Sequence, residues 1–418
     1  MQLPRAVPVF VLACACGRTE LIGRADADAD GTSVDPSASS TDTSGPPPPP
    51  PPSCREQGGT IARDGGPWVI TDSPSFSSPL GLVVDETGLF AMWLGPFVGT
   101  PPSPNVRGVR VDRNGVVQGE PFVPWERLIS LHGTTHAAPG GALLTYCGRD
   151  GTGDLAMSRI VDASGQTIVD EVVRTQLGQS CGAVAPDGVW TGSHHLFAWT
   201  DNSGFEFEVT LDVADASLIS QHATLLAFDG ELTVPPRFAV GAQTVTLIVG
   251  LAGGGLAIWR LDLAGEPLMA PSELFSSADL RDPVIAAAPD GSAWIWLTDG
   301  DAEGIVRIVV DPTGAVTEAF VPVEVPPARY SELRLEPWPG GAIVVGNAYA
   351  PPDEIIAWFA VDDRGSPIAW ELVDDGLPSL YEARGVPATD GDQAWVLYRA
   401  GFEDDSAELR MLRVGCIR

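Results

Sequence analysis

Ser180 is the first residue whose surroundings suggest covalent chemistry. It lies at the centre of GQSCG (residues 178–182), which fits the G-x-S-x-G pattern of a serine nucleophile. That pattern requires a strand followed by a helix, which exposes the serine oxygen on a sharp turn. Here the stretch precedes a strand-like segment and contains Cys181, a candidate for a disulfide. We therefore interpret it as a structural loop.

The histidines are the next candidates, for acid–base chemistry or for zinc. They are His132, His136, His194, His195 and His222. His132 and His136 lie an even number of residues apart and could share one face of a strand. The stretch LHGTTHAAPGG (residues 131–141) is nevertheless typical of a loop that leads into a strand, and no Cys or Glu stands at zinc spacing. We expect these histidines to be solvated or locally hydrogen-bonded.

Acidic side chains form another candidate metal site. Asp299, Asp301 and Glu303 belong to DGDAEG (residues 299–304), which could hold calcium or a cationic ligand. A calcium loop needs Glu at its twelfth position, and Val310 stands there. Similar acidic loops occur at residues 353–354 and 403–405. If these loops share one face they form an acidic patch, and a solvated rim is the interpretation we favour over calcium.

Tryptophans could form a platform for carbohydrate. One set falls on apolar strand-like segments, where packing in the core is the expected role: Trp93, Trp199, Trp294, Trp296 and Trp395. Trp125, Trp338 and Trp370 lie nearer to loops and are the better candidates for ligand binding.

A repeat of about fifty residues must position all these groups. Pairs of an aliphatic residue and Asp begin at Val111, Val161, Leu211, Leu261, Val310 and Val361. Most continue as Asp-x-x-Gly, in which Asp opens a turn and Gly closes it, and the pair at Leu211 is the exception. A second marker with the same period is a glycine before an apolar strand: Gly88, Gly141, Gly192, Gly241, Gly291, Gly341 and Gly391.

Each repeat contains four short strand-like runs bounded by Gly, Asp and Pro, and long segments of helical periodicity are missing. Four antiparallel strands in fifty residues are typical of a propeller blade. The span from about Phe76 to Arg418 holds seven such repeats. The last one ends after its third strand, so residues 54–70 are expected to supply the fourth. The sequence thus predicts an all-β fold, a seven-bladed β-propeller of four-stranded antiparallel blades, closed by strands from both ends.

The cadence PDG…W…D…VD-x-x-G resembles β-propellers of the NHL and related repeat classes over about 85% of the chain. The chain departs from the Gly-His and Trp-Asp signature of WD40 repeats and from the double glycines of kelch repeats. The resemblance therefore implies a generic propeller, and no catalytic residue can be carried over from it.

The cysteines are expected to fasten this ring. Cys54 and Cys416 stand at the two ends of the closing blade, and Cys147 and Cys181 lie in neighbouring blades. We predict the pairs 54–416 and 147–181, with buried free thiols as the alternative.

The N-terminal residues predict export. Residues 1–13 have an early Arg and a short apolar run, as in a signal peptide. VLAC (residues 11–14) resembles the lipobox of bacterial lipoproteins, which implies a lipid on Cys14 and an outer-membrane location at the cell envelope. Ordinary cleavage near Cys14, giving a secreted protein, is the alternative. Residues 14–53 are rich in Asp, Ser and Pro and are expected to be a disordered tether before the propeller domain of residues 54–418.

The net charge of the chain limits the kinds of partner that it can bind. The net charge is −31, all 24 basic residues are Arg, and the lack of Lys excludes a Schiff-base lysine and a phosphate-loop lysine. So acidic a protein is not expected to bind nucleic acid, and it should reach a membrane only through its lipid. The leading hypothesis is a monomeric binding or scaffold module of the cell envelope, with a protein or polysaccharide ligand and no cofactor. The alternatives are a hydrolase or lyase with a metal in the central channel, and an envelope-assembly factor.

Overall fold

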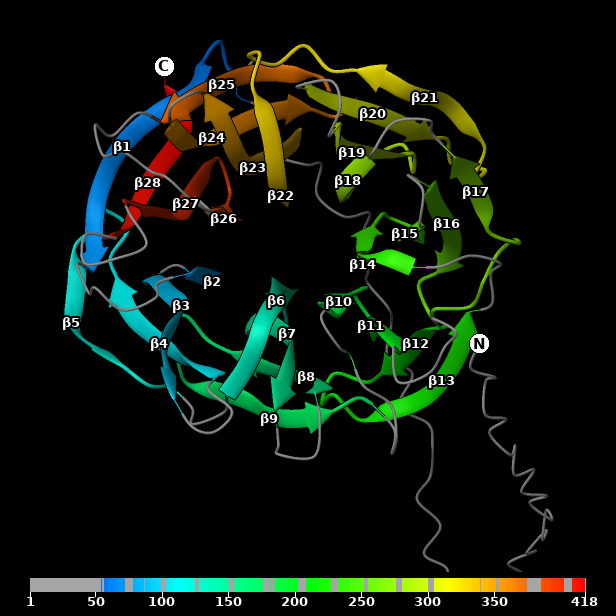
Figure 1. Cartoon of the computed structure of the whole chain (residues 1–418), viewed down its shortest axis with the longest axis horizontal. Coiled ribbons are helices and arrows are strands. Elements are labelled where there is room, and N and C mark those ends of the chain that lie inside the picture. Colours follow the sequence, from blue (N-terminus) through cyan, green and yellow to red (C-terminus); the bar gives the residue numbers. More distant parts are fainter. Residues whose placement is uncertain are drawn as a thin grey trace, which may run out of the picture. The chain divides into compact units, whose positions relative to one another are not determined.

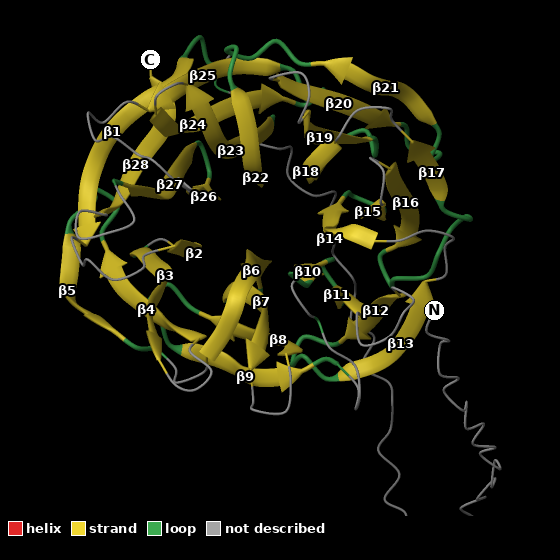
Figure 2. Ribbon diagram, viewed as in Figure 1, coloured by secondary structure: helices red, strands yellow, loops and turns green. Residues whose placement is uncertain are grey.

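The computed structural model consists of β-strands and the turns between them (Figures 1 and 2). The residues that it describes are 54, 56–71, 78–85, 87–98, 103–124, 128–149, 154–175, 181, 185–201, 208–226, 232–251, 255–275, 280–299, 304–338, 340–350, 353–373, 385–401 and 408–417. Among them there is no helix, and so none that could cross a membrane. The predicted signal peptide and tether, with Cys14, lie outside the described residues.

The strands form seven antiparallel blades, which confirms the predicted all-β propeller. In chain order, the four strands of each of the first three blades are β2 (Ser78–Asp85), β3 (Gly88–Val98), β4 (Ser103–Val111) and β5 (Val117–Phe122); β6 (Leu128–Ala138), β7 (Gly141–Arg149), β8 (Asp154–Val161) and β9 (Thr167–Val173); and β10 (Asp187–Trp190), β11 (His195–Asp201), β12 (Glu208–Ala214) and β13 (Ser220–Leu226). The next three are β14 (Leu232–Val240), β15 (Thr244–Leu251), β16 (Gly255–Asp262) and β17 (Ser272–Phe275); β18 (Leu280–Ala287), β19 (Ala293–Asp299), β20 (Gly304–Val310) and β21 (Val316–Pro322); and β22 (Arg329–Trp338), β23 (Gly341–Ala350), β24 (Asp353–Asp362) and β25 (Pro367–Val373).

The seventh blade closes the ring with both ends of the described chain. Its order is β26 (Gly385–Asp390), β27 (Gln393–Ala400), β28 (Glu408–Ile417) and β1 (Thr60–Thr71). β1 pairs antiparallel with β28 from Thr60 opposite Ile417 to Thr71 opposite Leu409. The disulfide between Cys54 and Cys416 fastens this closure, with 5.5 Å between the Cα atoms. Figure 1 shows β1 in blue beside β28 in red.

The second disulfide joins Cys147 on β7 to Cys181, which precedes the third blade. Both cysteines are fully buried. Both predicted pairs are therefore present. Disulfides persist in oxidising compartments, which indicates a protein that functions outside the cytoplasm.

The core lies between blades rather than within them. The described residues form seven hydrophobic clusters, and each joins two neighbouring blades. In one of them Trp93 of the first blade packs with Trp395 of the seventh. All five tryptophans predicted to pack in the core are buried. Because one blade exposes two apolar faces, only a closed ring covers them all.

The Asp-x-x-Gly turns contribute to the same interfaces. In the turn at residues 362–365, the carboxylate of Asp362 accepts hydrogen bonds from the backbone N–H groups of Arg364 and Ser366. Gly365 has φ +71, and an added Cβ would lie 2.8 Å from the ring of Trp294 in the preceding blade. Glycine is therefore required twice, for the left-handed backbone and for close packing against the neighbour.

The exceptional repeat at Leu211 keeps this turn but shifts it. Its turn begins at Asp215 rather than Asp212 and closes with Leu218, which has φ 62 and is fully buried. The freed Asp212 pairs with Arg174 at 3.1 Å, inside the protein.

Arginines connect each of several blades to the turn of the next one. Guanidinium groups donate to carbonyl oxygens in that turn at five interfaces, through Arg110 to Ser164, Arg174 to Leu218, Arg260 to Pro312, Arg307 to Arg364 and Arg413 to Arg113. The planar guanidinium has five N–H donors, which suits bonds to several carbonyls at once.

Candidate functional site: an axial pocket

The candidate site is a pocket on the axis of the ring. Residues from the innermost strands of all seven blades line it: β2, β6, β10, β14, β18, β22 and β26. The space between its lining residues is about 840 Å³ when the open solvent at its mouth is included. An axial pocket between inner strands is a site that only the closed ring creates.

Irregular pairing in the inner strands turns polar side chains toward this pocket. The register shifts between Val234 and Arg237 in β14, and between Ser331 and Arg334 in β22. Comparable shifts occur in β2, β6 and β18. A bulge re-aims the side chains that follow it, and here Arg237 and Arg334 are the first paired residues after their shifts.

Two of these irregular strands are also linked through a left-handed backbone. Asp282 on β18 and Glu332 on β22 have φ 49 and φ 51, outside the region that L-residues prefer. The carboxylate of Asp282 accepts a hydrogen bond of 2.9 Å from the backbone N–H of Glu332. The bond between blades thus supports a backbone conformation that is unfavourable by itself.

Asp187 on β10 is the central acceptor of the pocket. Its Oδ1 lies 2.8 Å from Nε2 of His136 on β6, and its Oδ2 accepts a 2.9 Å hydrogen bond from the backbone N–H of Phe238 on β14. Its side chain is fully buried, whereas that of His136 is 24% exposed. Asp187 therefore ties three consecutive blades together at the axis.

Asp187 and His136 shift each other's pKa. Burial by itself would raise the pKa of Asp187, but the charge and hydrogen bond of His136 outweigh it and lower the pKa to about 2. Burial by itself would lower the pKa of His136, but Asp187 outweighs it and raises the pKa. The pair thus favours an imidazolium beside a carboxylate.

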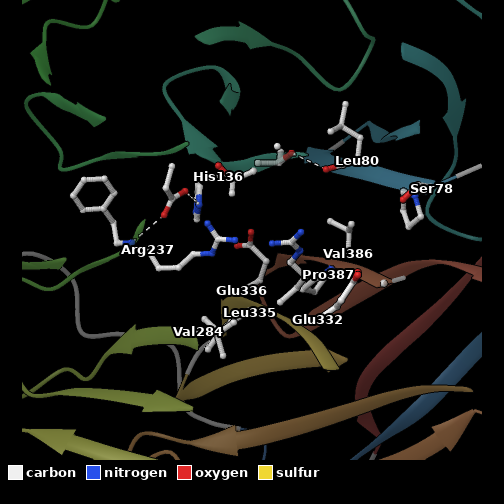
Figure 3. A pocket seen from close by; sticks show the side chains of 18 of the residues that line it. Ser78, Leu80, His136, Arg237, Val284, Glu332, Leu335, Glu336, Val386 and Pro387 are labelled. Atoms are coloured by element: carbon white, nitrogen blue, oxygen red, sulfur yellow. Dashed lines mark hydrogen bonds and ion pairs between the residues drawn. The ribbon is translucent and has the colours of Figure 1, made fainter. Parts of the chain in front are cut away.

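Glu336 and Arg237 face the same space (Figure 3). Burial raises the pKa of Glu336 to about 7, with His136 lowering it and Asp187 raising it further. Burial, and next the positive charge of Arg334, lower the pKa of Arg237 to about 10. At neutral pH Arg237 is charged, and Glu336 is divided between its two protonation states.

The structure brings one of the residues singled out by sequence into this pocket and leaves others elsewhere. The interpretation of residues 131–141 as a loop is wrong, because Leu128–Ala138 is strand β6 and carries His136 to the axis. His136 is bonded to a residue in the next blade rather than locally. His132 lies on the same strand. Ser180 lies outside the described residues.

The acidic calcium candidates are not assembled in the described part of the chain. Asp299 ends strand β19, and Asp301 and Glu303 fall outside the described residues. Within the described ranges, no three His, Cys, Asp or Glu side chains lie together as a metal site. The calcium site stays a prediction.

The loop tryptophans differ in their positions. Trp338 is 7% exposed and lines a second cavity between the sixth and seventh blades, and Trp370 on the outer strand β25 is 52% exposed. Trp125 lies outside the described residues. None of the described lining residues of the axial pocket is Trp or Tyr.

Sequence reasoning missed Asp187, Arg237, Arg334 and Glu336. A signal was available, because His136, Asp187 and Arg237 are spaced by 51 and 50 residues, the period of the repeat. Spacing close to the period places them on the innermost strands of three successive blades. Polar residues at the inner-strand register of a propeller indicate the axial pocket.

No protein-family model and no curated protein sequence matches this chain. Similar solved structures are numerous, with 531 chains. A puromycin hydrolase is similar over 82% of this chain and 53% of its own, with 15% identity and a TM-score of 0.48. A prolyl endopeptidase is similar over 82% and 50%, with 12% identity and a TM-score of 0.47. This chain spans about half the length of those two proteins.

The BP39L lectin from Burkholderia pseudomallei is similar over 82% of this chain and all of its own, with 13% identity and a TM-score of 0.50. At this identity the similarity concerns the fold alone. Since propellers serve unrelated functions, the function must be argued from the pocket.

Proposed function

We propose that this protein is an exported binding module that holds its ligand in the axial pocket. The observation that carries the proposal is the convergence of His136, Arg237 and Glu336 from three blades on one solvent-connected cavity. Burying charged groups is unfavourable unless they have partners. A ligand that supplies those partners would explain why these charged groups are placed in the pocket, since the stability of the ring does not require them there.

The ligand belongs to a partner at the cell envelope, either a protein or a polysaccharide. The test is a pull-down from envelope extracts, with a glycan array in parallel, using wild type and the double variant Arg237→Met/Arg334→Met. Arg329→Met is the matched control, because Arg329 lies on the same strand β22, is exposed and does not line the pocket. Capture that the double variant loses and the control keeps supports the proposal. Capture that is equal in all three contradicts it.

The lipid on Cys14 and the tether of residues 14–53 hold the propeller at the outer membrane in this proposal. Its support is the VLAC stretch at residues 11–14 and the two disulfides of the folded part. Cys14→Ser should move the protein from the membrane fraction to the soluble fraction. Unchanged fractionation contradicts the lipid anchor and leaves a secreted protein.

A second candidate is an acid–base hydrolase or lyase. It is favoured by the oriented His136, whose Nε2 faces Asp187, together with Glu336, whose pKa near 7 suits proton transfer at neutral pH. Any metal would need ligands from beyond the described residues. Turnover of a polysaccharide or peptide panel by wild type, with no turnover by His136→Gln, supports this candidate. Equal turnover by both proteins rejects it.

A further inference from the structure

Arg237 and Arg334 are two cations that act on each other, and among the described residues neither guanidinium forms an ion pair, although Asp187 and Asp282 lie near enough to affect Arg237. Both line the axial pocket. The guanidinium of Arg237 donates to the carbonyl oxygen of its neighbour Pro236 at 2.8 Å, and the side chain of Arg334 has neither a hydrogen bond nor an ion pair among the described residues. In contrast, the blade-connecting arginines donate to carbonyl oxygens of the next blade. Two neighbouring guanidinium groups repel each other, and an anion between them removes that repulsion.

The rest of the pocket wall limits the kind of anion. Its apolar part is mostly aliphatic, with Leu80, Leu94, Val284, Leu335 and Val386 among its residues, and Phe238 supplies the one phenyl ring of the described lining. Sugar rings are usually held by exposed aromatic faces and many hydrogen bonds, whereas the described lining contains no Trp or Tyr. Aliphatic walls next to guanidinium groups are complementary to an acid with a short apolar body.

We infer that the axial pocket binds a carboxylate attached to a short apolar group, with Arg237 and Arg334 pairing with the carboxylate oxygens. This inference rests on the proposed function and specifies its ligand. Arginine matches a carboxylate through two parallel N–H donors, and such charge-assisted hydrogen bonds are stronger than neutral ones. The same chemistry occurs in a small aliphatic acid and at the free C-terminus of a peptide that ends in an apolar residue.

The charged groups around the ligand make its binding depend on pH. Glu336 faces His136 from β6, Asp187 from β10 and Arg237 from β14; Glu332 and Arg334 lie on its own strand β22. Asp282 on β18 is near Arg237, and β2 and β26 add no charged residue to the described lining. Ionised Glu336 repels a carboxylate, whereas its neutral form can donate a hydrogen bond to it. Binding should therefore weaken as the pH rises through the range where Glu336 loses its proton.

The first experiment measures hexanoate binding to the whole protein by titration calorimetry, at a pH near 6. Acetate tests the apolar wall, and hexanamide tests the charge. We expect hexanoate to bind more tightly than acetate and hexanamide to fail. Arg334→Met should weaken binding about tenfold or more, the typical effect of losing a charged hydrogen bond. Arg329→Met should leave binding within about twofold of wild type.

Folding is not expected to complicate this comparison, because the Arg334 side chain forms no hydrogen bond or ion pair with another described residue, and Met keeps the apolar stem. Unfolding temperatures of the variants check this point. If Arg334→Met unfolds early, Arg334→Gln provides the same comparison without a charge.

Two further measurements identify where the carboxylate ligand comes from and whether the proton on Glu336 controls its binding. A tripeptide ending in Leu is compared with its C-terminal amide: binding of the free acid alone assigns a peptide terminus, and binding of hexanoate alone assigns a free small acid. Both results support the inference, and binding of hexanoate alone would replace the envelope protein or polysaccharide of the proposed function by a free small acid. Wild type should bind about tenfold more weakly near pH 8 than near pH 6, while Glu336→Gln should lose most of this difference.

Other outcomes overturn the inference. Binding of inorganic phosphate or sulfate with no carboxylate binding would identify the wrong anion. Failure of hexanoate and of the free peptide, or equal binding by Arg334→Met, would exclude a carboxylate held by the arginines. In either case a pull-down that still depends on the pocket would leave the proposed function standing with another ligand.

Discussion

Removing the disulfide between Cys54 and Cys416 tests how the ring is held closed. The two cysteines are separated by 362 residues, whereas Cys147 and Cys181 are separated by 34. A cross-link stabilises a protein by limiting the unfolded chain, and its effect grows with the logarithm of the loop length. The second disulfide is therefore an internal control for the first.

The loop lengths set the expected magnitudes. The chain-entropy relation assigns about 6 kcal/mol to the 362-residue separation and about 4 kcal/mol to the 34-residue separation. Replacing Cys54 and Cys416 by Ala should thus lower the free energy of unfolding by about 2 kcal/mol more than replacing Cys147 and Cys181. The difference is more dependable than either value, because the constant part of the relation cancels.

The assay is unfolding in guanidinium chloride followed by tryptophan fluorescence, since the buried tryptophans report on the interfaces between blades. Wild type, each double variant and the quadruple variant are compared at a pH where all fold. An equal or larger loss for the 147–181 variant would refute the reasoning. It would mean that the ladder between β1 and β28 closes the ring without help from the covalent link.

Three other predictions concern the axis and the interfaces. Arg260→Met should lower the free energy of unfolding by about 2–4 kcal/mol, because Arg260 is buried and donates hydrogen bonds to groups in two blades. As a control, Arg364→Met on the surface should change that free energy by under about 0.5 kcal/mol. Thermal unfolding of both variants checks this prediction. Wild type should lose stability as the pH falls from about 4 to about 2, because the pKa of Asp187 is lowered from 3.8 to about 2 on folding, and Asp187→Asn should lack this part of the acid dependence; denaturant titrations across that range check it. Asp187→Asn should also lower the pKa of His136, which an NMR titration of the imidazole measures, and an unchanged pKa would contradict the coupling.

The blades could be predicted because their signals are local. An Asp that accepts backbone N–H bonds and a Gly with positive φ make a turn wherever they stand in the chain, as at Asp362 and Gly365. The repeat at Leu211 shows the limit of this reasoning. There the turn begins at Asp215 and closes with Leu218, and the sequence gives no local signal for a left-handed backbone at a leucine.

The axial pocket was hardly predictable, because its parts are separated along the chain. The Gly and Pro neighbours of His136 are typical of a loop rather than of strand β6, and its partner Asp187 lies 51 residues away. Arg237 and Glu336 stand in strands whose irregular pairing reverses the expected alternation of faces. A one-residue irregularity decides whether a side chain faces the core or the channel, and sequence patterns do not locate it.

What the sequence by itself determined is the repeating unit, the number of repeats and the pairing of both ends, together with the cysteines that fasten them. These features follow from the residues that form the turns and from a sequence repeat of about fifty residues. What only the tertiary structure decided is which polar side chains meet on the axis and which of the described arginines there form no ion pair. The physical reason is that the pocket belongs to no single blade: seven inner strands create it when the ring closes, and its charges become neighbours only then.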